Sequence, residues 1–74
     1  MAALRKIGCT VYVIGRPVDI VVGLRARNWL IDCKSKSGVL TPDQEKFFAA
    51  WKGQVCIVRS PEDAIRVVRE SYRR

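Results

Sequence analysis

Residues 18–34, VDIVVGLRARNWLIDCK, decide the fold of this 74-residue chain. Two runs rich in β-branched and aromatic residues flank Arg25 and Ala26, which predicts a β-hairpin. With the turn centred on that pair, Asp19 faces Asp32 across the two strands. A register shifted by one residue would instead put the two aspartates on opposite faces and leave them as surface residues.

Facing carboxylates suggest a bound cation, because like charges opposite each other destabilise a sheet. Lys34 lies two positions after Asp32, so the two side chains share a face. Mg²⁺ and Mn²⁺ prefer oxygen ligands, and we expect Asp19, Asp32 and the backbone carbonyl of Cys33 to bind one of them. Lys34 would then orient an attacking water or stabilise charge on a phosphate, with Gln44 hydrogen-bonding the water, the phosphate or Lys34.

The remaining signals predict one domain over residues 1–74, of the α/β (α+β) class, with element order αβββαβα and a mixed sheet flanked by helices. Thr41, Pro42 and either Gln44 or Glu45 form a good helix start. A crossover through that helix would place the last strand parallel to the strand of Asp32. The expected elements are a short helix at 2–7 ended by Gly8, strands at 9–14, 18–24 and 27–34, a helix ending at Gly53 with an apolar side of Phe47, Phe48 and Trp51, a strand at 54–59, a helix from Pro61 capped by Ser60, and a frayed basic tail at 70–74.

Composition and charge limit the classes of function. The chain is 49% hydrophobic and 28% charged, which is typical of a globular domain and not of a disordered one. No apolar run approaches about 20 residues and the first residues lack a signal-peptide pattern, so we expect a cytoplasmic protein that does not span a membrane. The net charge of +7 favours a polyanionic partner, although it also suits a solubilising surface.

The three cysteines do not follow a metal-binding pattern. Cys9, Cys33 and Cys56 are far apart, and the chain has no histidine, so a zinc site is not expected. Each cysteine lies in an apolar context, which predicts small buried hydrophobic residues. The absence of histidine excludes acid–base catalysis by an imidazole.

Further motifs give the chain a resemblance to a known family. The spacing of Asp19, Asp32 and Lys34 resembles the core of the PD-(D/E)XK nucleases. LTPDQ at 40–44, the aromatic cluster up to Trp51, GQV at 53–55 and RSPEDA at 59–64 are similar to a VRR-NUC domain (virus-type replication-repair nuclease) of that superfamily. The similarity runs from about Gly8 to Val68, nearly the whole chain.

The resemblance implies a restriction-endonuclease-like core and a Mg²⁺- or Mn²⁺-dependent endonuclease acting on branched DNA. Small stand-alone phage or bacterial members are associated with homodimers and with cleavage of Holliday junctions, and a two-fold dimer suits two symmetric cuts. Carried over to this sequence, Asp19 and Asp32 are metal ligands, Lys34 is the motif lysine, and Gln44 is the glutamine of the following helix.

Two other hypotheses stay open. Family members usually carry an N-terminal glutamate that completes the metal site, whereas no acidic residue precedes Asp19 here. The chain would then be a DNA-binding protein that keeps the fold with weak or absent catalysis. A third hypothesis is a protein-interaction module whose basic face binds an acidic partner. Gln44 also has a simpler interpretation as a capping residue, even within the family.

Basic residues outside the motif are candidate phosphate contacts. Arg25 and Arg27 would lie at the hairpin tip, where a duplex can approach. No helix carries an evident set of base-reading residues, so we expect DNA binding without sequence specificity. The full set of candidate contacts is Arg16, Arg25, Arg27, Lys36 and Lys52.

Overall fold

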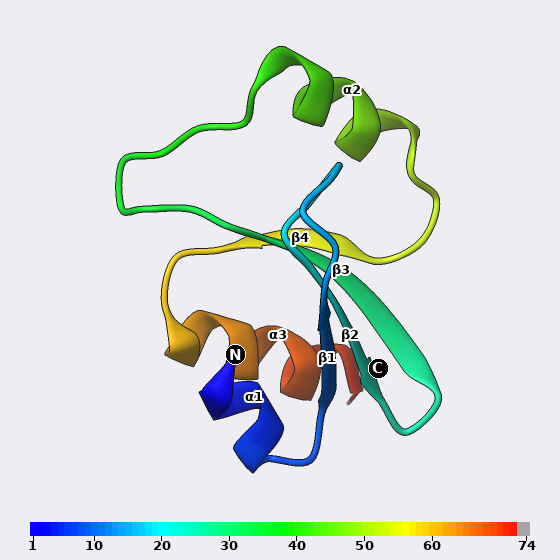
Figure 1. Cartoon of the computed structure of the whole chain (residues 1–74). Helices are drawn as coiled ribbons and strands as arrows, with labels where there is room; N and C mark the ends of the chain where they lie inside the picture. Colours follow the sequence, from blue (N-terminus) through cyan, green and yellow to red (C-terminus); the bar gives the residue numbers. More distant parts are fainter. Residues whose placement is uncertain (73–74) are drawn as a thin grey trace.

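A computed structural model describes residues 1–72 and shows, within them, a small α+β fold with three helices and a four-stranded mixed sheet (Figure 1). The sheet order is β1-β2-β3-β4, with β1, β2 and β3 antiparallel and β4 parallel to β3. The predicted element order and the parallel last strand are confirmed. The elements are α1 (Ala2–Lys6), β1 (Thr10–Val13), β2 (Ile20–Leu24), β3 (Arg27–Cys33), α2 (Pro42–Ala50), β4 (Val55–Val58) and α3 (Pro61–Tyr72).

The β2–β3 hairpin has the predicted register. Val21 pairs with Leu30, and the turn is centred on Arg25 and Ala26. Both turn residues have positive φ, 49° and 68°, as a type I′ turn requires and as the twist of the flanking strands favours. The paired residues run from Ile20 with Ile31 to Leu24 with Arg27, so Asp19 precedes β2 and the expected pair of Asp19 and Asp32 lies one position beyond the ladder.

One face of the sheet forms the hydrophobic core. Alternate strand residues point to it, and α1 and α3 cover it together at one end of the molecule (Figure 1). Leu4 of α1 and Ala64 and Val68 of α3 are buried there, as expected from the apolar spacing of α3. The sheet contributes the buried side chains of Val11, Ile20, Val22, Trp29, Ile31 and Val58.

The two helices on the core end as their sequences predict. Gly8 has a φ of +98°, and its N–H donates to the carbonyl of Arg5, so a glycine terminates α1 in a left-handed conformation. Ser60 Oγ accepts a hydrogen bond from the N–H of Asp63 at 3.1 Å and caps α3. Residues 70–72 are helical and not frayed, while residues 73–74 of the predicted tail lie outside the described part.

Helix α2 lies at the other end of the molecule, away from α1 and α3 (Figure 1). Thr41 and Gln44 form the complete capping box. None of its side chains is buried, so the expected apolar side is only partly covered. The helix ends at Ala50, three residues before the expected Gly53. Trp51 is extended and folds over Gly53, where a Cβ would lie 2.8 Å from the indole Nε1.

Strand β1, at one edge of the sheet, is shorter than predicted and carries exposed apolar side chains. Tyr12 is 68% exposed and Val13 is 66% exposed. The two side chains alternate across the strand, so they point to opposite faces.

In the described residues 1–72, no helix is long and apolar enough to cross a membrane.

Candidate active site

Asp32 is the centre of the candidate site. Its side chain is 1% exposed, and it is the one buried charged residue in the described part of the chain. Lys34 Nζ lies 2.9 Å from Asp32 Oδ2, and Gln44 Nε2 donates a hydrogen bond to Oδ1 at 3.2 Å. A buried carboxylate without partners would be strongly unfavourable, so these two contacts explain how Asp32 is accommodated.

Gln44 connects α2 to the sheet. Its Oε1 accepts from Lys34 Nζ at 2.9 Å and from the N–H of Thr41 at 3.1 Å. Its Nε2 donates to Asp32 Oδ1 and to the carbonyl of Pro17 at 3.3 Å. The same side chain therefore caps the helix and closes a three-membered cluster with Asp32 and Lys34.

Asp19 is fixed beside this cluster by its side chain and its backbone. Its Oδ2 accepts the N–H of Cys33 at 2.7 Å, across the hairpin. Its carbonyl accepts the N–H groups of Ile14 and Gly15 at 2.9 and 3.1 Å, which holds the connection from β1. Asp19 therefore lies against the residue that directly follows Asp32, and both carboxylates belong to the same end of the hairpin.

The donor set suits a hydrated hard cation. Asp32 Oδ2 is buried and, apart from the ion pair with Lys34, receives no hydrogen bond of good geometry. Residues 1–72 contain no group of three His, Cys, Asp or Glu side chains that could hold a metal ion. Asp19 and Asp32 are the two candidate carboxylate ligands. That number is compatible with Mg²⁺, which usually keeps several waters and binds one or two carboxylates plus substrate phosphates.

Cys33 does not behave as predicted. It is exposed and not buried, at the last position of β3. Partial desolvation of the sulfur raises the pKa of the Cys33 thiol, and the Asp19 carboxylate raises it further. The thiol is therefore protonated at neutral pH and a poor nucleophile or metal ligand. Cys9 is buried as predicted, Cys56 is half-buried, and all three thiols are free.

Arg59 holds the loop that joins β3 to α2. Its Nη1 donates to the carbonyls of Ser35, Lys36 and Gly38 at 2.6, 3.3 and 2.9 Å. This contact fixes the segment between Lys34 and the start of α2. The sequence reasoning missed Arg59, and equally the Pro17 carbonyl, because a side chain bonded to distant backbone carbonyls leaves no pattern in the sequence.

The candidate DNA contacts are exposed but do not gather in one place. Arg16 lines a hollow of about 620 Å³ beside Gln44, and Lys36 lies in the loop after β3. Arg25 and Arg27 lie at the opposite end of the hairpin. Since Arg27 and Asp32 are five positions apart on β3, about 17 Å of strand separates them. Lys52 follows α2. The basic residues therefore extend along the molecule on both sides of the cluster.

No protein-family model, curated protein or solved structure matches this chain. The residues and geometry described above are therefore the basis for a functional conclusion.

Proposed function

We propose that the chain is a metal-dependent, structure-selective DNA endonuclease with a restriction-endonuclease-like core of the PD-(D/E)XK type, acting on Holliday junctions or other branched DNA. The observation that supports this best is the contact network of Asp32, Lys34 and Gln44 at the end of the hairpin that also holds Asp19. A carboxylate, an ammonium and an amide are in contact there, and the carboxylate of Asp19 is held beside them on the N–H of Cys33. Metal-assisted phosphodiester hydrolysis uses groups of these kinds.

Asp19 and Asp32 would hold Mg²⁺ or Mn²⁺, with the Cys33 carbonyl as a further candidate ligand. A bound cation of this kind polarises the phosphate and lowers the pKa of an attacking water. Lys34 is held at 2.9 Å by both Asp32 and Gln44, so its ammonium is already oriented before substrate binds. In that position it stabilises negative charge developing on the phosphate or orients the water.

The net charge supports a nucleic-acid substrate. At +7 on 74 residues, the chain attracts a polyanion over the whole surface, and the exposed basic residues on both sides of the cluster suit an extended substrate. A four-way junction offers two symmetric strands, so the proposal includes a homodimer with two active sites. Sedimentation velocity tests that part, because a monomer at all concentrations would contradict it.

The test is cleavage of a labelled four-way junction beside a linear duplex and a single strand of the same sequence. Each substrate is incubated with Mn²⁺, Mg²⁺ or EDTA. We expect cutting of the junction with either metal, slower cutting of the linear substrates, and none in EDTA. Cutting that persists in EDTA, or no cutting with any metal, would contradict the proposal.

A second candidate function is DNA binding without catalysis. It is favoured by the ion pair in which Lys34 occupies Asp32 Oδ2. On this hypothesis the junction shifts on a gel equally in EDTA and in Mn²⁺ and stays intact. The salt dependence of binding would then be strong, because phosphate contacts would supply the affinity.

A further inference from the structure

The sheet face opposite the core is largely uncovered beyond the cluster of Asp32. We call it the open face. It consists of the strand residues that alternate with the core residues, and Asp32 belongs to it by the same alternation. Helix α2 covers it only near Asp32. Its other members are Thr10, Tyr12, Val21, Gly23, Asn28 and Leu30.

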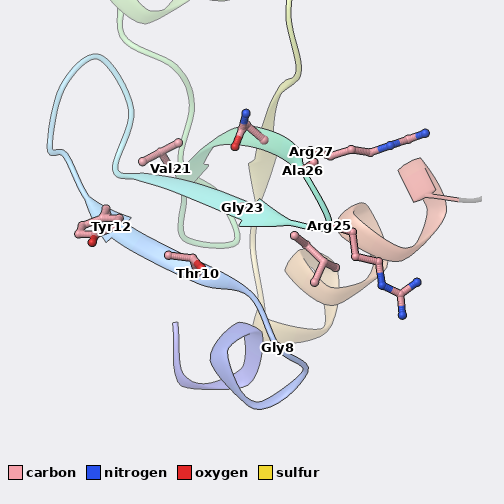
Figure 2. A pocket seen from close by; sticks show the side chains of 10 residues that line it. Gly8, Thr10, Tyr12, Val21, Gly23, Arg25, Ala26 and Arg27 are labelled. Carbon is pink, nitrogen blue, oxygen red and sulfur yellow. The ribbon is translucent and has the colours of Figure 1, made fainter.

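A hollow of about 440 Å³ lies on the open face near the hairpin tip. Figure 2 shows Tyr12 and Thr10 on β1 and Val21 on β2 around Gly23. Gly23 has no side chain to fill the hollow. A Cβ at this position would have Asn28 Oδ1 as its nearest neighbour, at 3.6 Å. The aromatic ring of Tyr12 is thus presented to solvent beside a recess of the size of a small-ligand pocket.

A second hollow of about 470 Å³ continues the first and shares Val21 and Asn28 with it. Trp51 borders it and is 45% exposed. Its ring is held by stacking on Phe47, with centroids 5.3 Å apart. The open face therefore has an aromatic side chain on each side of Val21, one from β1 and one from the segment after α2.

The hairpin tip next to the hollow carries strain. Arg25 and Ala26 both adopt positive φ, which costs a non-glycine residue about 1–2 kcal/mol. Glycine or asparagine would satisfy the same turn with less strain. Strained backbone of this kind concentrates at functional sites. Figure 2 shows the side chains of Arg25 and Arg27 extending from this tip, where both line the hollow.

We propose that the open face binds an unpaired DNA strand, with bases stacked on Tyr12 and Trp51 and phosphates contacted by Arg25 and Arg27. Exposed aromatic rings on a sheet, flanked by cationic side chains, suit splayed-out bases and not the stacked interior of a duplex. Charge complementarity favours this occupant, because a chain with a net charge of +7 attracts the phosphates of a nucleic-acid strand.

The proposal rests on the proposed function in taking DNA as the ligand, and it defines the substrate more closely. A DNA strand bound on the open face would extend from Arg27 to Asp32, a distance of about 17 Å along β3. The preferred substrate is therefore branched DNA with an unpaired segment close to the scissile phosphate.

The test is equilibrium binding of a fluorescent oligothymidylate of about 12 nucleotides, a length within the range of single-strand sites, in EDTA. We compare the wild type with Tyr12→Ala, Tyr12→Phe and Val13→Ala. Val13 is the matched control, since it is equally exposed on the same strand and points to the opposite face. We expect Tyr12→Ala to weaken binding between about fivefold and a hundredfold, and the other two to stay within about twofold. Arg25→Ala or Arg27→Ala should each lower the salt slope by about 0.7.

Equal affinity of Tyr12→Ala and Val13→Ala would overturn the proposal. So would a Tyr12→Ala variant whose sedimentation coefficient falls while its oligonucleotide affinity is unchanged, because the open face would then be a contact between copies. Binding in EDTA is separate from cleavage. Tyr12-dependent binding without junction cutting supports the inference and contradicts the nuclease, whereas junction cutting without oligothymidylate binding contradicts the inference alone.

Discussion

The two faces of the sheet differ in what holds their neighbours in place. On the core face, apolar side chains such as Val22 and Ile31 are fully buried against α1 and α3. On the open face, α2 buries no side chain and is joined to the sheet by Gln44 through polar contacts to Asp32 and Lys34. The core face supplies the stability of the fold, because burial of apolar surface is the main favourable contribution to the free energy of folding.

The comparison teaches where function is expected in so small a domain. A buried carboxylate is unfavourable for stability, and a half-covered helix contributes little to it. Both features lie on the open face, together with the strained tip at Arg25 and Ala26. The single core of so small a domain supplies little stability to spare. Residues that reduce stability are therefore expected where they serve binding or chemistry.

The largest effect on stability should separate the two faces directly. Ile31→Ala removes a fully buried side chain and should lower the free energy of unfolding by about 3–4 kcal/mol. Leu30→Ala, its half-buried neighbour on the open face, should cost about 1 kcal/mol. Urea unfolding measures both. Equal losses would mean that the open face is covered in solution.

The next effect concerns the ion pair. Lys34→Met leaves Asp32 buried without its cation and should destabilise the fold by about 2 kcal/mol, somewhat below the range for a fully buried pair because Lys34 is 18% exposed. Adding Asp32→Asn removes the uncompensated charge, so the double variant should regain most of the loss. Strict additivity of the two single changes would show that the pair does not interact.

A smaller and opposite effect is expected at the hairpin tip. Ala26→Gly relieves positive φ and should stabilise the fold by about 1 kcal/mol. Ala49→Gly, the same exchange on the exposed side of α2, should destabilise it by a similar amount at most. Thermal unfolding of both variants gives the signs, and a destabilised Ala26→Gly would contradict the strained turn.

The smallest effect is a loss of stability at alkaline pH. Burial raises the pKa of the Cys56 thiol from 9.0 to about 11, with a smaller contribution from Cys33. The unfolded chain therefore loses this proton first, and stability falls as pH rises from 9.0 to about 11. Cys56→Ala should show a shallower fall in melting temperature over that range. Parallel curves for the two proteins would rule out a contribution from this thiol.

The hairpin could be predicted from the sequence because its signals are local. Its β-branched runs and two-residue turn give the register, which is confirmed from Ile20 with Ile31 to Leu24 with Arg27. The capping box likewise depends on neighbouring residues and identifies Gln44. The PD-(D/E)XK identity of the site, its metal and its substrate stay predictions.

What could not be predicted depends on tertiary contacts. The end of α2 was misplaced because Trp51 leaves the helix to fold over Gly53. Cys33 is exposed at the last position of β3, which its apolar sequence neighbours do not reveal. Arg59 was missed because its acceptors are backbone carbonyls more than 20 positions away.

The central claim is that the carboxylate of Asp32 belongs to a metal-dependent nuclease centre on the open face. The most direct measurement is the rate of junction cleavage in Mn²⁺ by the wild type, by Asp32→Asn and by Glu62→Gln, which removes an exposed acidic charge from α3. We predict a loss of at least about a hundredfold for Asp32→Asn and an unchanged rate for Glu62→Gln. A folded Asp32→Asn variant that cuts the junction as fast as the wild type would contradict the claim.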